Sequence, residues 1–385
     1  MTIKEQREKV WQEYVEREKQ NPQRLQEIKE QQMTFGEATM KYGIKVIGEP
    51  DENGYPLFIA LHGGGYGDTP DVNNQQWEHM GVFYAEAVKQ GVYVNPRGVR
   101  DTWDTHANPE SYPLYDRLIQ NMILFYNVDP NRVYIMGYSA GGDGVYLIAP
   151  RMADRFAACN MSAGHPNGIS LVNLYNEPIC LQGGMLDDAY DRHKVTAEYI
   201  LYLDKLAKEN PGAYPHTGFV HKDKGHHFYD HAEEEQEVLS NLQGFIDNDD
   251  VTSHKADANA IHFMTKYVRT PLPGKVVWDL SLRAPLRQTT NFYWLDAPKN
   301  VEAGLVVASI DKAENAIRVE KLEGIAGQVS ALLNDDMLDF DKPVNVIYPD
   351  GKTVITEAQV SEELLRESTL RSGDQNLQFV ARIQL

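Results

Sequence analysis

A serine between small residues has the setting that a catalytic nucleophile requires. Ser139 lies in the run GYSAGG at residues 137–142, which follows the apolar run VYIM and precedes a segment typical of a helix. In the pattern GxSxG the serine occupies a sharp turn from strand to helix, where glycines allow close chain approach and the hydroxyl is exposed above a sheet. The pattern alone is weak evidence, but the strand and helix around it strengthen the interpretation. The sequence therefore predicts Ser139 as a nucleophile.

A serine hydroxyl also needs a general base, and the base needs a carboxylate that orients it. In the order expected after a GxSxG serine, the carboxylate comes first and the histidine second. Asp187 follows the strand-like run PICLQGG, with Asp188 and Asp191 as competitors that could instead cap a helix. His226 and His227 follow the run TGFVHK. We favour Asp187, and we favour His226 because it directly follows a glycine; Asp188 and His227 remain alternatives.

Acyl transfer requires donors aimed at the developing oxyanion. The loop HGGGYG at residues 62–67 directly follows the strand-like run LFIAL. We expect the backbone N–H groups of Gly64, Gly65 and Ala140 to form the oxyanion hole. A phosphate-binding loop would need a GK[ST] ending or a GxGxxG register, and this loop has neither.

The remaining candidate residues follow the same edge of the predicted sheet. Substrate pockets in such folds lie beyond the carboxyl ends of the strands. Candidate pocket residues there are Tyr66, Arg97, Trp103, Tyr138, His165 and Asn167. The competing interpretation is structural, since an arginine can pair with a nearby acid and a tryptophan can anchor its loop.

The other histidines do not suggest a metal site. His221 and His231 are interpreted as ordinary surface histidines, and no HExxH-like spacing of ligands accompanies them. We therefore expect no metal and no cofactor.

The elements that must position these residues alternate between strand and helix from residue 36 to residue 271. Such alternation predicts an α/β domain with a mostly parallel, doubly wound sheet. Strands are expected at 41–47, as an edge strand, and in the runs LFIAL, GVYVNP, VYIMG, AACNMSAG, EPICLQGG and TGFVHK. Helices are expected at 77–89, 112–126, 141–152, 190–209 and 231–247.

Two further segments flank this domain. Residues 1–35 read as an N-terminal helical extension divided at Pro22, either packed on the main domain or serving as a lid or dimer contact. Residues 272–385 contain eight short strand-like runs and a candidate helix at 361–367, which predicts a β-sandwich-like domain.

Charge and cysteine content limit the partners. The chain has 385 residues and a formal charge of -19, which disfavours nucleic acid and anionic membranes. Its two cysteines, Cys159 and Cys180, exclude a disulfide framework, and the charged start lacks the apolar core of a secretion signal. We expect a cytoplasmic protein without a membrane partner; self-association is left open.

Five runs together resemble a known family over roughly residues 40–250. The runs are HGGGYG, GYSAGG, PRMADRFAA, GGMLDDAYDR and KGHHF. The chain is similar to the α/β-hydrolase serine esterases, in particular the phospholipase/carboxylesterase and poly(3-hydroxybutyrate) depolymerase-like group. The resemblance implies a triad of Ser139, Asp187 and His226, an acyl-enzyme intermediate and no cofactor. The doubled histidine and the C-terminal β domain depart from the family's pattern.

The leading hypothesis is thus hydrolysis of a small-molecule or carbohydrate-linked carboxylic ester. One alternative is a peptidase of the prolyl-oligopeptidase kind, although that family carries its β unit before the hydrolase domain. The other is a non-catalytic binding protein whose β domain recognises carbohydrate through Trp278, Tyr293 and Trp294. Aromatic residues at strand spacing are more often core.

Overall fold

The computed structural model describes residues 1–65, 70–283, 286–287 and 289–385, which divide into two compact units. The first, here called the large unit, comprises residues 30–115 and 126–269. The second, called the flanking unit, comprises residues 1–29, 116–125 and 270–385.

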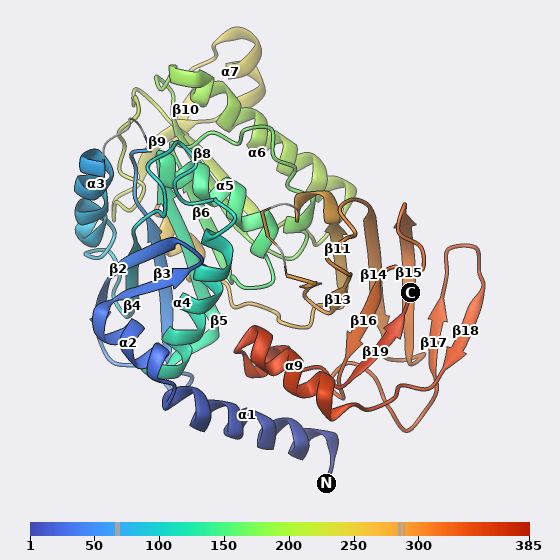
Figure 1. The fold of residues 1–385 in the computed structure, drawn as a ribbon. Coiled ribbons are helices and arrows are strands. Elements are labelled where there is room, and N and C mark those ends of the chain that lie inside the picture. The colour runs from blue at the N-terminus through green and yellow to red at the C-terminus, as the bar shows by residue number, and fades with distance from the viewer. Residues whose placement is uncertain (66–69, 284–285, 288) are drawn as a thin grey trace. The chain divides into compact units, whose positions relative to one another are not determined.

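The large unit is built on a ten-stranded sheet of order β1-β2-β4-β3-β5-β6-β7-β8-β9-β10 within the described residues (Figure 1). From β4 to β8 neighbouring strands are parallel, whereas the pairs at both ends are antiparallel. The strands are β1 Gln32–Phe35, β2 Ala38–Ile47, β3 Tyr55–Leu61, β4 Gly91–Pro96, β5 Val128–Tyr138, β6 Ala158–Ser162, β7 Ile179–Gly184, β8 His216–His221, β9 Gln236–Leu239 and β10 Ser253–Ala256.

Helices cover both faces of the sheet because its central strands are apolar on both sides. In β3, Phe58 and Ala60 belong to a buried cluster that also contains residues of α3 (Pro70–Phe83) and α8 (Ala260–Met264). Alternate residues of a strand point to opposite faces. Leu61 accordingly approaches α5 (Ala140–Met152) on the other side. The remaining helices of this unit are α6 Arg192–Glu209 and α7 Leu242–Asn248.

This arrangement confirms the predicted fold class, a mostly parallel sheet with helices on both faces and an additional all-β region. Several local predictions were wrong. Residues 32–35 form strand β1, so 41–47 is not an edge strand. The segment 231–247 is helical only in α7, because residues 236–239 pair with β10 as strand β9. Helix α3 begins seven residues earlier than the predicted start at 77.

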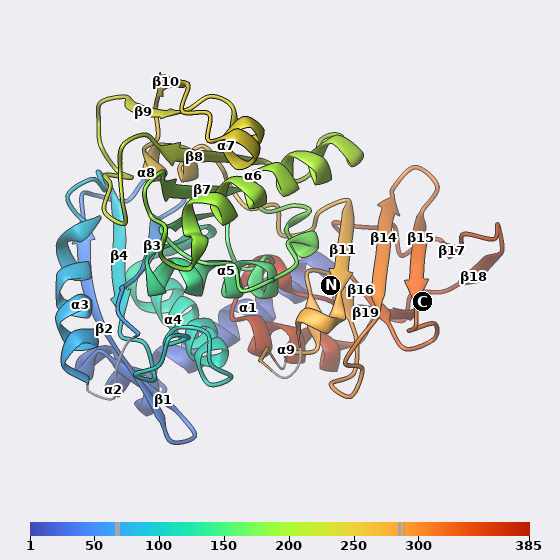
Figure 2. The same cartoon turned by 90° about the horizontal axis from the view of Figure 1, so that it is seen from above.

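In the flanking unit, the C-terminal region forms two sheets within the described residues, of order β11-β14-β15-β17-β18 and β12-β13-β16-β19 (Figure 2). Trp278 of β11 stacks on Phe292 of β12, which joins the two sheets. Trp278, Tyr293 and Trp294 are all buried, so they form core and do not present a sugar-binding face. The strands are β11 Lys275–Asp279, β12 Asn291–Phe292, β13 Leu295–Asp296, β14 Leu305–Asp311, β15 Ala316–Glu323, β16 Ser330–Leu333, β17 Val344–Ile347, β18 Thr353–Thr356 and β19 Ala381–Gln384.

The N-terminal helices α1 (Ile3–Lys19) and α2 (Pro22–Glu30) largely belong to the flanking unit. Val10 of α1 packs on Leu365 of α9 (Glu362–Ser372) in a small buried cluster. The unit also includes residues 116–125 of α4 (Ser111–Tyr126). Residues 1–29 therefore group with the C-terminal region, whereas the sequence suggested a helical extension at 1–35 that packs on the main domain or serves as a lid or dimer contact.

No helix among the described residues combines the length and the apolar character that a bilayer span requires.

Candidate active site

Ser139 occupies a strained turn between β5 and α5. Its φ and ψ are 59° and -120°, and its N–H donates to the carbonyl of Ser162 at 2.9 Å. A Cβ on Gly137 would lie 2.1 Å from the carbonyl oxygen of Gly141, and one on Gly141 would lie 2.1 Å from that of Leu61. Both positions therefore require glycine. A non-glycine residue held at positive φ is a feature of functional sites.

The side chains of Ser139, His226 and Asp187 form a continuous hydrogen-bonded chain. His226 Nε2 lies 2.9 Å from Ser139 Oγ, and His226 Nδ1 lies 2.7 Å from Asp187 Oδ2. A buried carboxylate accepts but does not donate, so Nδ1 carries the proton and Nε2 accepts from the serine hydroxyl. Asp187 is 3% exposed, and its second oxygen lies 3.5 Å from Arg192 Nη1. The structure thus brings together the three residues predicted as a triad.

The competing acids and histidine do not take these places. Asp188 and Asp191 are exposed, and in the described part of the chain neither contacts His226. His227 is also exposed; its ring packs edge to face on that of His226, 5.5 Å between centroids. His226 is therefore the base candidate that the geometry favours.

Of the three residues predicted for the oxyanion hole, Gly64 and Ala140 fit that role and Gly65 does not. Gly64 has a φ of 105° and lines the cavity beside the serine, and Ala140 is the first residue of α5, where the N–H has no acceptor within the helix. The N–H of Gly65 instead donates to Asn73 Oδ1 at 2.6 Å. Gly65 was therefore wrongly placed in the oxyanion hole, because a side chain from α3 already accepts its hydrogen bond.

Arg97 supports that loop and does not line the cavity. The amide of buried Asn73 donates to Asp101 at 2.8 Å, and Arg97 donates to the same carboxylate. Arg97 also donates to the Asn74 side chain at 3.0 Å and to the Gly98 carbonyl at 2.7 Å. The prediction of Arg97 as a pocket residue was wrong, and its structural interpretation is the one observed.

The other predicted pocket residues differ in their outcome. Tyr138 lines the cavity. Trp103 is 52% exposed and lies outside the lining, as does His165, whose N–H donates to Asp143 at 2.7 Å. Tyr66 lies outside the described residues. Asn167 is exposed and also lies outside the lining. Of the six pocket candidates, Trp103, His165 and Asn167 thus belong to neighbouring surface.

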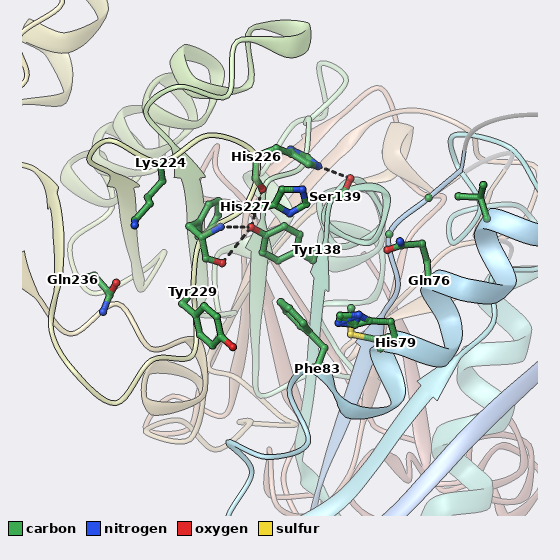
Figure 3. Close-up of a pocket in the computed structure, with 15 residues that line it drawn as sticks. Gln76, His79, Phe83, Tyr138, Ser139, Lys224, His226, His227, Tyr229 and Gln236 are labelled. Atoms are coloured by element: carbon green, nitrogen blue, oxygen red, sulfur yellow. Dashed lines mark hydrogen bonds between the residues drawn. The ribbon is translucent and has the colours of Figure 1, made fainter.

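The cavity in front of Ser139 has a volume of about 610 Å³. One wall is a single face of α3, and the opposite wall is the loop that carries His226 (Figure 3). The lining residues are Gly63, Gly64, Val72, Gln76, His79, Met80, Phe83, Tyr138, Ser139, Lys224, His226, His227, Phe228, Tyr229 and Gln236. The α3 residues were not predicted, although their i, i+4, i+7 spacing marks one helical face.

Burial shifts the protonation of several groups around the site. The pKa of His62 is lowered to about 4 by burial, and its Nε2 accepts the N–H of Gly98 at 3.0 Å, so the ring is neutral. Burial likewise lowers the pKa of His221 to about 4, and this ring bonds Gln182 at 2.8 Å. Burial raises the pKa of Asp143 to about 6.

The prediction that His221 and His231 are ordinary surface histidines was wrong, because His221 is buried and His231 is half-buried.

Metal binding finds no support in the described part of the chain, where no three His, Cys, Asp or Glu side chains gather as potential ligands.

The chain is similar to known proteins over only part of its length. No protein-family model matches the chain. A bifunctional acetylxylan esterase/xylanase, XynS20E of Neocallimastix patriciarum, is 32% identical over 155 residues, covering 39% of this chain. The match spans only 22% of that relative's length.

Solved structures with similar parts include two bacterial hydrolases. The poly(3-hydroxybutyrate) depolymerase LpqC from Bordetella parapertussis is 16% identical, covers 49% of this chain and 79% of its own, and has a TM-score of 0.38. Poly(aspartic acid) hydrolase-1 from Sphingomonas sp. KT-1 is 13% identical, covers 51% and 92%, and has a TM-score of 0.41. On the strand order and the serine turn described above, the chain has the α/β-hydrolase fold with an all-β accessory region.

Proposed function

We propose that this chain is a serine hydrolase that cleaves carboxylic esters through an acyl-enzyme intermediate. The observation that carries the proposal is the hydrogen-bonded chain from Ser139 Oγ through the His226 ring to the buried Asp187 carboxylate. Such a chain activates a hydroxyl that is otherwise a poor nucleophile at neutral pH.

In the proposed reaction, Ser139 Oγ attacks the ester carbonyl while His226 Nε2 takes the hydroxyl proton. Asp187 stabilises the resulting imidazolium through Nδ1–H. The N–H groups of Gly64 and Ala140 stabilise the tetrahedral oxyanion. His226 then donates its proton to the departing alcohol, which leaves the acyl group on Ser139. Water, deprotonated by His226, releases the acid and restores the serine.

The proposed substrates are small-molecule or carbohydrate-linked esters. The partial relative named an acetylxylan esterase/xylanase supports an ester bond to a sugar as one such substrate. An ester is favoured over a peptide because the all-β region follows the large unit in the sequence, whereas peptidases of the prolyl-oligopeptidase kind carry their β unit before the hydrolase domain.

The test compares wild type, Ser139→Ala and Ser170→Ala on ester and peptide substrates assayed side by side. Ser170 is a matched control, since it lies in the large unit outside the cavity lining. We expect Ser139→Ala to lose ester turnover by at least about 10³-fold with unchanged folding, and Ser170→Ala to retain it. Wild-type ester turnover by folded Ser139→Ala would refute the proposal, and peptide turnover without ester turnover would favour the peptidase.

A further inference from the structure

Aromatic rings from three elements line the cavity in front of Ser139. Phe83 and His79 come from α3, and their rings lie 5.5 Å apart at 70°. Tyr138 comes from the end of β5, and its ring lies 5.5 Å from Phe83 at 74°. Tyr229 comes from the loop that follows β8. Figure 3 shows the Phe83 side chain between those of His79 and Tyr229. Tyr229 is linked to Phe83 through the His231 ring, which lies 4.9 Å from Tyr229 and 4.8 Å from Phe83, and we call these lining rings the aromatic wall.

Parts of this aromatic wall lack a cover from the described chain. Tyr229 is 65% exposed, and Phe83 is half-buried. Removing exposed apolar surface from water is favourable. A ligand that covers this part of the cavity, beside the nucleophile, is therefore stabilised by its burial. The Phe83 ring packs edge to face on four rings, those of His79, Tyr84, Tyr138 and His231, and its remaining exposed part lines the cavity. A ligand ring can add to this cluster at the half-buried Phe83 and at the exposed Tyr229.

The size of the cavity and the charge of its lining limit the class of ligand that it can bind. A volume of about 610 Å³ greatly exceeds what an acetyl group fills. No Asp or Glu belongs to the described lining, although the chain carries a formal charge of -19. Gln76, Gln236 and Lys224 provide hydrogen-bond donors around the rings. The lining therefore suits a flat apolar group that bears polar substituents.

We propose that this cavity binds a flat aromatic group of the ester substrate, with Phe83 and Tyr229 as its principal contacts. The inference rests on the proposed esterase function and adds the substrate class. An aromatic ring bound here is stabilised both by burial and by electrostatic contacts with the aromatic rings of the wall. A saturated ring with the same number of carbon atoms is stabilised by burial alone.

The test uses pairs of esters that differ only in this property, with alkyl partners so that each ester holds at most one ring. One pair is methyl 3-phenylpropanoate and methyl 3-cyclohexylpropanoate. The other is 2-phenylethyl acetate and 2-cyclohexylethyl acetate. We expect kcat/KM for the full-length protein to favour the phenyl member of at least one pair by about tenfold. Equal rates within both pairs would overturn the inference.

Variants connect the preference to the wall. Phe83→Leu keeps an apolar side chain but removes the ring, and Tyr229→Leu does the same at a more exposed position. Val82→Leu is the control, because Val82 lies on α3 outside the cavity lining and is 50% exposed. We expect Phe83→Leu and Tyr229→Leu each to lower the phenyl-to-cyclohexyl ratio about threefold or more, and Val82→Leu to leave it unchanged.

The outcomes separate the two proposals. If esters are hydrolysed by Ser139 but neither pair shows a ring preference, the aromatic site fails and the esterase function stands. If Phe83→Leu and Tyr229→Leu slow both members of each pair equally, the rings are only structural and the inference is overturned. If no ester is hydrolysed and Ser139 reacts with no serine-directed probe, both proposals fall.

Discussion

The hydroxyl of Tyr138 donates to the backbone carbonyl of His226 at 2.8 Å. The same oxygen accepts the N–H of Phe228 at 2.9 Å. Burial raises the pKa of Tyr138 far above its ordinary value, so the hydroxyl remains protonated and able to donate. The residue that precedes the candidate nucleophile thus holds the loop that carries the candidate base.

Removing this hydroxyl should loosen the histidine loop. In Tyr138→Phe we expect kcat for ester hydrolysis to fall about tenfold and the free energy of unfolding to fall by about 1 to 2 kcal/mol, because the buried Phe228 N–H loses its acceptor. The control is Tyr199→Phe, which removes a hydroxyl that bonds the Ile169 carbonyl at 2.9 Å outside the cavity lining. Equal loss of kcat in both variants would contradict the positioning role.

The carboxylate assignment can be tested by a pair of neighbouring substitutions. Asp187→Asn should lower kcat by on the order of 10⁴-fold, because an amide at that place can donate to Nδ1 and hold the wrong tautomer of His226. Asp188→Asn changes an exposed side chain and should leave kcat within about twofold. Steady-state kinetics on one ester decides between them, and a larger loss in Asp188→Asn would reverse the assignment.

The conformation of the loop that contains Gly64 and Gly65 should depend on Asn73, whose side chain accepts the hydrogen bond from Gly65. Asn73→Ala removes that acceptor and the donor to Asp101, so we expect kcat to fall about tenfold or more as Gly64 loses its fixed position. Gln75→Ala, an exposed change on the same helix, serves as the control. Normal kcat in a folded Asn73→Ala protein would show that the loop holds its position without this bond.

Stability should fall as the pH drops through the weakly acid range. His221 and His62 have pKa values of about 4 when folded, below the ordinary value of about 6.5. The unfolded chain therefore binds more protons between these values, and each histidine costs about 2 kcal/mol of stability at pH 5. Burial raises the pKa of Asp143 to about 6 and that of Glu177 well above its ordinary value, and both carboxyls act in the opposite direction. Burial also lowers the pKa of a third histidine, His106, which adds to the effect of His221 and His62.

Urea unfolding at pH 7 and pH 5 measures this dependence. His221→Gln retains a polar side chain opposite Gln182 and should show a smaller difference between the two pH values than wild type does. An unchanged difference in His221→Gln would mean that His221 is not the source of the effect.

Patterns local in sequence predicted most of the large unit. Most of the parallel strands contain an apolar run, and Ser139, Asp187 and His226 each come after such a strand, so their meeting at one sheet edge follows from the topology. The turn at Ser139 was predictable because close chain contacts allow only glycine at Gly137 and Gly141.

What the sequence did not predict depends on contacts between distant residues. Residues 236–239 follow an acidic run that favours helix, yet pairing with β10 makes them a strand. The amide of Gly65 is occupied by Asn73, a side chain eight residues away on another element. His221 is buried because Gln182 of a neighbouring strand provides a partner. None of these partners follows from the local pattern.

The most direct test of the account is covalent labelling of the folded protein with a fluorophosphonate probe, followed by peptide mass mapping. We predict a single adduct on Ser139 that is lost in His226→Ala and retained in His227→Ala, because only the His226 ring bonds the serine hydroxyl among the described residues. A folded protein that forms no adduct, or one labelled at another serine, would contradict the proposed nucleophile.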